Sequence, residues 1–211
     1  MRIEVNNFSK TFRNVSVLEN ISVNLESGAI YVIIGPNGSG KSMFLRAISG
    51  LIYPTSGSIS IDGAVLHKDI SFPKNIGIII EKPSFLGYLT GLDNLKMLAD
   101  IKGILSTEQI AEYMTMFSLD PHDKKHVSKY SLGMVQKLGI IQAIMENPDV
   151  LILDEPFNAL DEHTVSMLHD MLIQYKNDGK LIVITSHHKS DIENLCDYTY
   201  RIENGRIASC D

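Results

Sequence analysis

The sequence predicts an α/β fold that is built on a mostly parallel sheet and interrupted by a block of helices. Short apolar runs separated by turn residues fill the first part of the chain, as is typical of strands. After Pro83, apolar residues recur at spacings of three and four, as is typical of helices. Two further apolar runs, at 150–153 and 181–185, enclose a helical stretch at 163–175. Strands that alternate with helices in this way favour a parallel sheet.

The predicted elements follow one another in a clear order. Strands are expected at 3–5, 17–25, 30–34, 58–61 and 76–80, with turn signals at 26–28, 54–57 and 62–63. A helix is expected at 41–49, directly after the third strand. The helical block comprises 92–101, 107–117 and 132–145, with a break at Leu119-Asp120-Pro121. In such a fold the ligand is expected beyond the carboxyl ends of the parallel strands.

Length and charge narrow the class of protein. The chain has 211 residues, which suits one domain, and a formal net charge of −6, which provides no basic field for a nucleic-acid backbone. We therefore expect no nucleic-acid partner. No run approaches the roughly 18 apolar residues that span a bilayer, and the first residues lack the apolar segment of a signal peptide. The expected location is cytoplasmic.

A phosphate-binding loop is the most specific motif. Residues 35–42 read Gly-Pro-Asn-Gly-Ser-Gly-Lys-Ser and lie between a predicted buried strand and a predicted helix. This order directs backbone N–H groups and a helix N-terminus at one point, where phosphates can bind. Lys41 is then placed to reach the β and γ phosphates, and the Ser42 hydroxyl to bind Mg²⁺.

Two adjacent carboxylates end the apolar run at 150–153. Asp154 and Glu155 can be tolerated there only at the open end of a strand, facing a cation or water. Asp154 suits Mg²⁺ binding, and Glu155 suits a base that orients or deprotonates the attacking water. Alone, the pair would be interpreted as a strand meeting solvent. Beside a phosphate loop, the catalytic interpretation is favoured.

Three weaker signals fit the same kind of site. Ser131 in Tyr130-Ser131-Leu132-Gly133 is an expected N-cap, and a capped helix start near a glycine can form a second anion site. The loop Asn158-Ala159-Leu160-Asp161 follows the carboxylates at short range. His187 ends another apolar run and could bind the γ-phosphate, although a lone histidine is usually structural and His188 is its neighbour.

Taken together, the phosphate loop, the Ser-Leu-Gly-Met segment, the Asp-Glu pair, the Asn-Ala-Leu-Asp loop and His187 resemble the nucleotide-binding domain of ABC transporters, in order and spacing. The resemblance covers essentially the whole chain. It implies a P-loop NTPase fold in a single domain at 1–211, with an antiparallel β part and an inserted helical lobe at roughly 84–147. It also implies that Phe12, otherwise a core candidate, stacks on adenine.

The resemblance implies a role for each matching residue. Catalytic roles fall to Lys41, Glu155 and His187, and Mg²⁺ binding to Ser42, Glu81 and Asp154. The ATP contacts it implies are Phe12, Gly35, Pro36, Asn37, Gly38, Ser39, Gly40, Lys41, Ser42, Met43, Ser131 and Gly133.

Three positions depart from the commonest pattern of the family. Leu132 replaces the first glycine of the signature, and Met43 stands where a second hydroxyl often contacts the α-phosphate. Glu81 occupies the position of a glutamine that links Mg²⁺ and water to the helical lobe. Together with 130–133, Glu81 resembles the branch of bacitracin and lantibiotic export or immunity ATPases. The alternative for Glu81 is a surface glutamate at a lobe boundary.

The function implied is an ATPase subunit that powers separately encoded permease subunits, at the inner face of the membrane. Two such subunits, identical or related, would enclose two ATP molecules head to tail, with the Lys41 loop of one facing Ser131 and Gly133 of the other. The expected cargo is a peptide antibiotic or similar compound. The alternative is an ABC-type ATPase of DNA repair, chromosome structure or translation; the first two need a long coiled coil and the last normally two tandem domains, which this sequence lacks.

Overall fold

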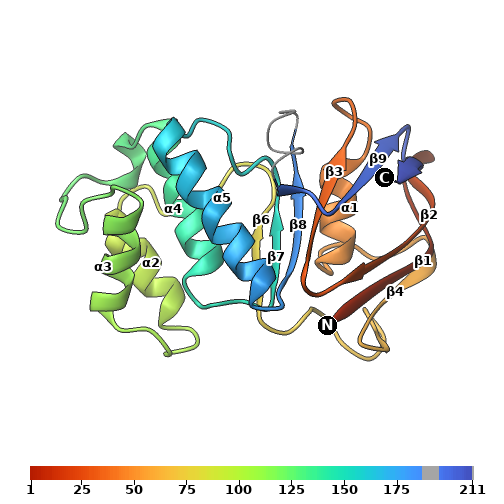
Figure 1. The fold of residues 1–211 in the computed structure, drawn as a ribbon, viewed down its shortest axis with the longest axis horizontal. Coiled ribbons are helices and arrows are strands. Elements are labelled where there is room, and N and C mark those ends of the chain that lie inside the picture. Colours follow the sequence, from red (N-terminus) through yellow and green to blue (C-terminus); the bar gives the residue numbers. More distant parts are fainter. Residues whose placement is uncertain (187–194, 211) are drawn as a thin grey trace.

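The computed structural model describes residues 1–186 and 195–210, in which the strands form two sheets (Figure 1). An antiparallel sheet has the order β2-β1-β4-β5, and a larger sheet has the order β10-β9-β3-β8-β7-β6. The strands are β1 (Arg2–Phe12), β2 (Val15–Glu26), β3 (Ala29–Ile34), β4 (Ser56–Ile61), β5 (Ala64–Val65), β6 (Ile76–Ile79), β7 (Val150–Leu153), β8 (Leu181–Thr185), β9 (Tyr198–Glu203) and β10 (Arg206–Cys210).

The strands of the larger sheet are parallel except for the outermost strand β10. β3 pairs in parallel with β8 and β9, and β7 with β6 and β8, whereas β10 runs antiparallel to β9. The predicted α/β class with a mostly parallel core sheet is thereby confirmed. Because the strands are parallel, the carboxyl ends of β3, β7 and β8 lie at one edge of the sheet, the upper edge in Figure 1.

Four of the helices begin after a polar side chain that accepts a backbone hydrogen bond. These N-caps are Thr90, Ser106, Ser131 and Asp161, and Ser106 forms a capping box with Gln109. The helices they open are α2 (Gly91–Ala99), α3 (Thr107–Met116), α4 (Leu132–Ile144) and α5 (Glu162–Asn177). A further α-helix, α1 (Lys41–Ile48), follows β3, and a short 3₁₀ turn spans Val127–Lys129.

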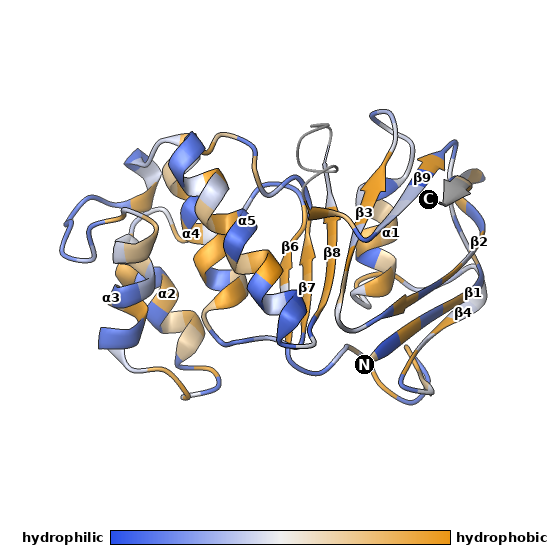
Figure 2. Ribbon diagram, in the orientation of Figure 1, coloured by the Kyte–Doolittle hydropathy of each residue, from blue (hydrophilic) through white to orange (hydrophobic). Residues whose placement is uncertain are grey.

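The hydrophobic core lies on both faces of the parallel sheet. Alternate residues of one strand face opposite sides: Ile30 and Val32 of β3 pack with the helices α2 to α5, whereas Tyr31 and Ile33 pack with α1 and the antiparallel sheet. The central strands β7 and β8 are buried along their whole length and appear as continuous apolar segments in Figure 2. Burial on both faces explains why these strands lack polar alternation.

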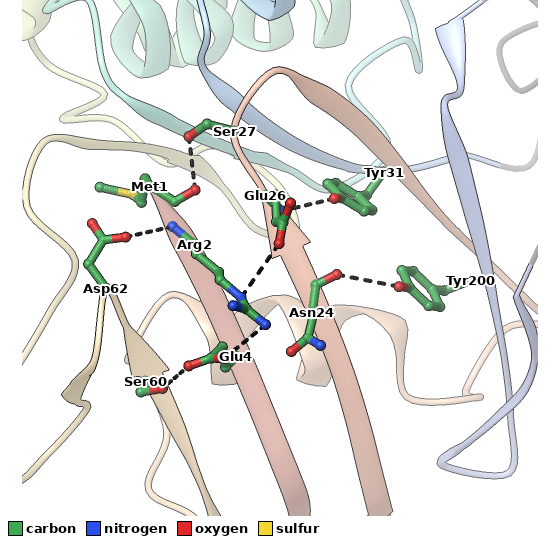
Figure 3. Close-up of polar contacts among 10 residues, drawn as sticks. All are labelled: Met1, Arg2, Glu4, Asn24, Glu26, Ser27, Tyr31, Ser60, Asp62 and Tyr200. Carbon is green, nitrogen blue, oxygen red and sulfur yellow. Dashed lines mark hydrogen bonds and ion pairs between the residues drawn. The ribbon is translucent and has the colours of Figure 1, made fainter.

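Polar contacts connect the antiparallel sheet to the parallel one (Figure 3). The Glu26 N–H at the end of β2 donates to the Tyr31 hydroxyl of β3 at 2.8 Å, and the Tyr200 hydroxyl of β9 donates to the Asn24 carbonyl at 3.4 Å. Arg2 forms ion pairs within the antiparallel sheet, with Glu4 and with Glu26. The contacts with Tyr31 and Tyr200 hold the end of β2 beside β9 and β3, the strand that leads into the phosphate loop.

Candidate functional site

The phosphate loop connects the end of β3 to the start of α1. Its glycines Gly35, Gly38 and Gly40 have positive φ angles of 145°, 76° and 112°, which side chains rarely adopt. A Cβ atom on Gly35 would lie 2.1 Å from the Ile202 carbonyl oxygen, so the loop packs directly against β9. A Cβ atom on Gly38 would meet nothing within 4 Å, which leaves the backbone open on that side.

The loop offers donors for phosphate oxygens. No side chain caps the start of α1 at Gly40, so the helix end can receive an anion. The buried ammonium group of Lys41 donates to the carbonyl oxygens of Gly35, at 2.8 Å, and Pro36, at 3.2 Å. The buried Ser39 hydroxyl has no hydrogen-bond partner among the described residues. A buried cation and a buried unpaired hydroxyl are the groups that a phosphate would satisfy.

Asp154 and Glu155 follow β7 and are anchored by Thr185 at the end of β8. The Thr185 hydroxyl donates to Asp154 Oδ1 at 2.6 Å and accepts from the Glu155 N–H at 2.8 Å. Both Asp154 and Thr185 are buried, and Glu155 has a positive φ of 49°. A non-glycine residue in this region is held there by its surroundings. One hydroxyl therefore holds the Asp154 carboxylate and the Glu155 backbone.

A single cavity of about 550 Å³ joins the phosphate loop to these carboxylates. Its size suits a small-molecule ligand. Its walls combine the Lys41 cation with acidic side chains. The cation suits the phosphates of a nucleoside triphosphate, and the acidic side chains suit a divalent cation bound with it. The lining residues are Val17, Asn37, Gly38, Gly40, Lys41, Ser42, Met43, Glu81, Lys82, Asp154 and Glu155.

Glu81 lies at the mouth of this cavity, but its side chain is already partnered. Its carboxylate forms an ion pair with Arg46 of α1 at 2.7 Å, and its N–H donates to Asp154 Oδ2 at 3.4 Å. Glu81 also has a positive φ of 62°. The backbone of Glu81 is thus joined to the predicted metal ligand Asp154, while its carboxylate is held by α1.

The structure does not bring every predicted site residue into the cavity. Ser131 caps α4 by accepting from the Met134 N–H at 3.2 Å, yet neither Ser131 nor Gly133 lines the cavity of the phosphate loop. Phe12 is 42% exposed at the end of β1, with the Lys10 ammonium 4.6 Å from its ring centroid, and it does not line the cavity either. Their predicted nucleotide contacts remain predictions.

The remaining predictions concern His187 and the magnesium ligands. His187 lies outside the described residues. Within the described ranges, no three His, Cys, Asp or Glu side chains converge to hold a metal ion. The predicted magnesium ligands Ser42, Asp154 and Glu81 include only two acids, which agrees with the way Mg²⁺ is bound by one or two carboxylates plus substrate phosphates.

Three positions beside the predicted residues take part in the geometry of the site. Val17 of β2 lines the cavity, Thr185 contacts the Asp154 carboxylate and the Glu155 N–H, and Gln136 of α4 donates to the backbone after Glu155. Thr185 precedes Ser186-His187 in the sequence, where only the histidine carried a signal. The contributions of Val17 and Gln136 depend on contacts between distant segments, and nothing in their local sequence points to them.

No helix among the described residues has the length and apolar character needed to cross a bilayer. The sequence model of the family described as ABC transporter matches residues 18–158, a span that includes the phosphate loop, α4 and the carboxylate pair.

Curated relatives extend the match over nearly the whole chain. An uncharacterized ABC transporter ATP-binding protein of Bacillus subtilis, YybJ, is 51% identical, over 97% of this chain and 94% of the relative. The lantibiotic transport ATP-binding protein SrtF of Streptococcus pyogenes is 35% identical, over 97% and 88%. The bacitracin transport ATP-binding protein BcrA of Enterococcus faecalis is 35% identical, over 97% and 67%.

Solved structures agree with the fold. An ATP-binding subunit of an ABC transporter superposes with a TM-score of 0.90 at 28% identity, covering 100% of this chain and 90% of the other. A bacterial ABC transporter cassette, solved as a dimer, superposes with a TM-score of 0.88 at 26% identity, covering 99% and 97%.

Proposed function

The chain belongs to the ABC transporter family and hydrolyses ATP, and on that premise we propose that it powers a separately encoded permease that exports or removes a peptide antibiotic. Its relatives include proteins named for lantibiotic transport and for bacitracin transport. Glu81 and the segment Tyr130-Ser131-Leu132-Gly133 are the features of this sequence that resemble that branch.

The observation that carries the catalytic part is the single cavity that joins the phosphate loop to the carboxylates. Lys41 and the N-terminus of α1 bind the β and γ phosphates. Ser42, Asp154 and Glu81 would hold Mg²⁺, which neutralises phosphate charge when it is bound. Glu155 orients or deprotonates the attacking water, and its backbone anchor to Thr185, at 2.8 Å, keeps it at the cavity wall.

A head-to-tail dimer accounts for the position of Ser131 and Gly133. Both lie at the start of α4 and outside the cavity of their own chain, so their predicted contact with ATP requires a second subunit. The neighbouring Leu132 is 61% exposed, as a residue at a contact surface between subunits would be in an isolated chain. The dimer reported for a related cassette supports the pairing of two such chains.

The permease is expected to dock on a groove between β6 and α4. Two cavities of about 240 Å³ each share Ile78 and Gln142 and form this groove. One cavity extends to Arg46 and Leu51 beside α1, and the other to Ile101 after α2. A helix docked in the groove would therefore contact both the part that carries the phosphate loop and the helical lobe. Docking there would place the chain at the inner face of the cell membrane.

Growth of the source organism in the presence of antibiotics tests the proposal. Deletion of the gene should raise sensitivity to bacitracin or to a lantibiotic. The wild-type gene should restore resistance. Lys41→Ala should not, because it loses the cation that binds the phosphates, and Glu155→Gln should not, because it loses the base. Expression of both variants at the wild-type level is the control.

Unchanged sensitivity to every peptide antibiotic, with new sensitivity to DNA damage, would instead support the alternative of a repair ATPase.

A further inference from the structure

The first two turns of α4 contact the segment that follows the predicted base, Glu155. A Cβ atom on Gly133 would lie 2.6 Å from the Ala159 carbonyl oxygen, so the helix and this segment are in direct backbone contact. One turn later, the Lys137 ammonium pairs with Asp161 at 2.7 Å, with the lysine side chain only 12% exposed. The hydrogen bond from Lys137 holds the pKa of Asp161 well below its usual range.

Gln136 lies between these two contacts and reaches nearest to the base. Its side-chain amide donates to the carbonyl oxygens of Glu155, at 3.4 Å, and Pro156, at 3.0 Å. Gln136 is buried, with 8% of its surface exposed. Removing the amide would leave the buried Pro156 carbonyl without this donor, which is costly inside a protein, while the Glu155 carbonyl would keep the Asn158 N–H at 3.3 Å.

Glu155 is therefore held from two sides. Thr185 of β8 accepts from its N–H, and Gln136 of α4 donates to its carbonyl oxygen. Together these contacts support a residue whose φ is 49°, a conformation that a non-glycine residue keeps only when its neighbours impose it. Gln136, Asp154 and Glu155 also line a second cavity, of about 260 Å³, next to that of the phosphate loop.

We propose that Gln136 is a positioning residue for the Glu155 carboxylate: its amide makes the alignment of the base depend on the placement of α4. This inference rests on the proposed role of Glu155 as base. The same helix begins at Ser131, whose predicted contact is the nucleotide of a second subunit. Dimer closure would therefore align the base of this subunit only when α4 is in the position in which Gln136 contacts Glu155.

The test compares the purified chain with Gln136→Met, which keeps the length of the side chain and removes the amide. Turnover should fall roughly tenfold to a hundredfold, as expected when a reacting group is misplaced by a fraction of an ångström to an ångström. Affinity for ATP should stay within about twofold, because Gln136 does not line the cavity of the phosphate loop. Gln136→Glu should lose more, since its carboxylate would face two carbonyl oxygens.

A matched control is Gln174→Met, which removes an amide that donates to Asp178 on the exposed side of α5. It should leave turnover unchanged. Thermal unfolding of each variant separates misplacement from loss of the fold. Gln136→Asn, which keeps the amide on a shorter side chain, provides a second variant and should fall between wild type and Gln136→Met.

The decisive readout is the double variant with Glu155→Gln. If Gln136 acts through the Glu155 carboxylate, adding Gln136→Met to Glu155→Gln should cause no further loss of turnover. A loss that multiplies in the double variant, or unchanged turnover in Gln136→Met, overturns the inference while leaving Glu155 as base. Wild-type turnover in Glu155→Gln overturns the inference together with the proposed base.

Discussion

At the residue scale, Glu81 is the side chain in which structure and sequence combine most usefully. The family resemblance implies a metal ligand there, whereas the structure shows its carboxylate 2.7 Å from Arg46. Arg46 holds only one of the two Glu81 carboxylate oxygens, Oε1, so a movement of this carboxylate toward Mg²⁺ would stretch or break the ion pair. The ion pair is partly exposed, so it contributes at most about 1 kcal/mol and Mg²⁺ can displace it.

Two substitutions of this pair should shift the Mg²⁺ requirement in opposite directions. Glu81→Gln removes a charged oxygen ligand, so more free Mg²⁺ should be needed for half-maximal ATPase activity. Arg46→Met releases Glu81, so up to about fivefold less should be needed. The binding of ATP with and without Mg²⁺ gives a readout independent of turnover. Coincident midpoints in all three proteins would make Glu81 a boundary residue only.

Tyr175 of α5 makes stability depend on pH. Its hydroxyl donates to the Ile144 carbonyl at 3.4 Å, and burial raises the pKa of Tyr175 to about 12. Between its usual pKa near 10 and this value, the folded chain keeps a proton that the unfolded chain releases. The free energy of unfolding should therefore be fully retained below pH 10 and fall as pH rises through this window.

Tyr175→Phe isolates this effect, because it has no proton to lose. Urea unfolding measured below and within the window should show a shallower decline than in wild type. Lys180, whose ammonium lies 4.2 Å from the Tyr175 ring centroid, acts with the opposite sign, since burial lowers its pKa. That contribution is present in both proteins and cancels to first order. Parallel declines would show that Tyr175 ionises as it does in water.

At the element scale, the sequence predicted the buried elements better than the exposed ones. The apolar runs of β7 and β8 and the spacing in α2 to α5 are strong signals because burial selects them. β1 was predicted at 3–5 but spans Arg2–Phe12, because register shifts after Val5 break the alternation of its side chains. β9 was missed because it is half-exposed and carries polar and aromatic residues that mimic a loop.

The contact of β6 with α4 depends on one glycine. A Cβ atom on Gly77 would lie 1.9 Å from the Ala143 carbonyl oxygen, so Gly77→Ala must push the helix away from the strand. Overpacking of this kind should lower the free energy of unfolding by about 1 to 3 kcal/mol. Gly87→Ala is the milder comparison, since its Cβ would lie 3.3 Å from Ser128 Cβ, a tight contact that a shift of a few tenths of an ångström relieves. Equal losses in urea unfolding would contradict the proposed packing constraint.

At the scale of the whole molecule, the sequence could predict the site because its motifs follow parallel strands. The phosphate loop, Asp154 and Glu155 each come directly after an apolar run, and parallel strands bring their ends to one edge. The anchors of the site could not be predicted in this way. Thr185 and Gln136 act through hydrogen bonds to segments 30 and 19 residues away, and only the folded chain places them there.

In the proposed head-to-tail arrangement the site would be complete only in a pair of chains, and Glu155→Gln tests this arrangement. This change keeps the shape of the side chain and removes the base, so ATP should bind but persist. The nucleotide would then hold the predicted head-to-tail pair closed, and the purified variant should elute as a dimer with ATP and as a monomer without it.

Adding Ser131→Arg introduces bulk and charge at the exposed start of α4, where the phosphate of the facing subunit is expected. The double variant should bind ATP and remain monomeric. Dimers that form equally well with Ser131→Arg would place the contact between subunits away from α4, and a single variant that stays monomeric with ATP would remove the head-to-tail arrangement altogether.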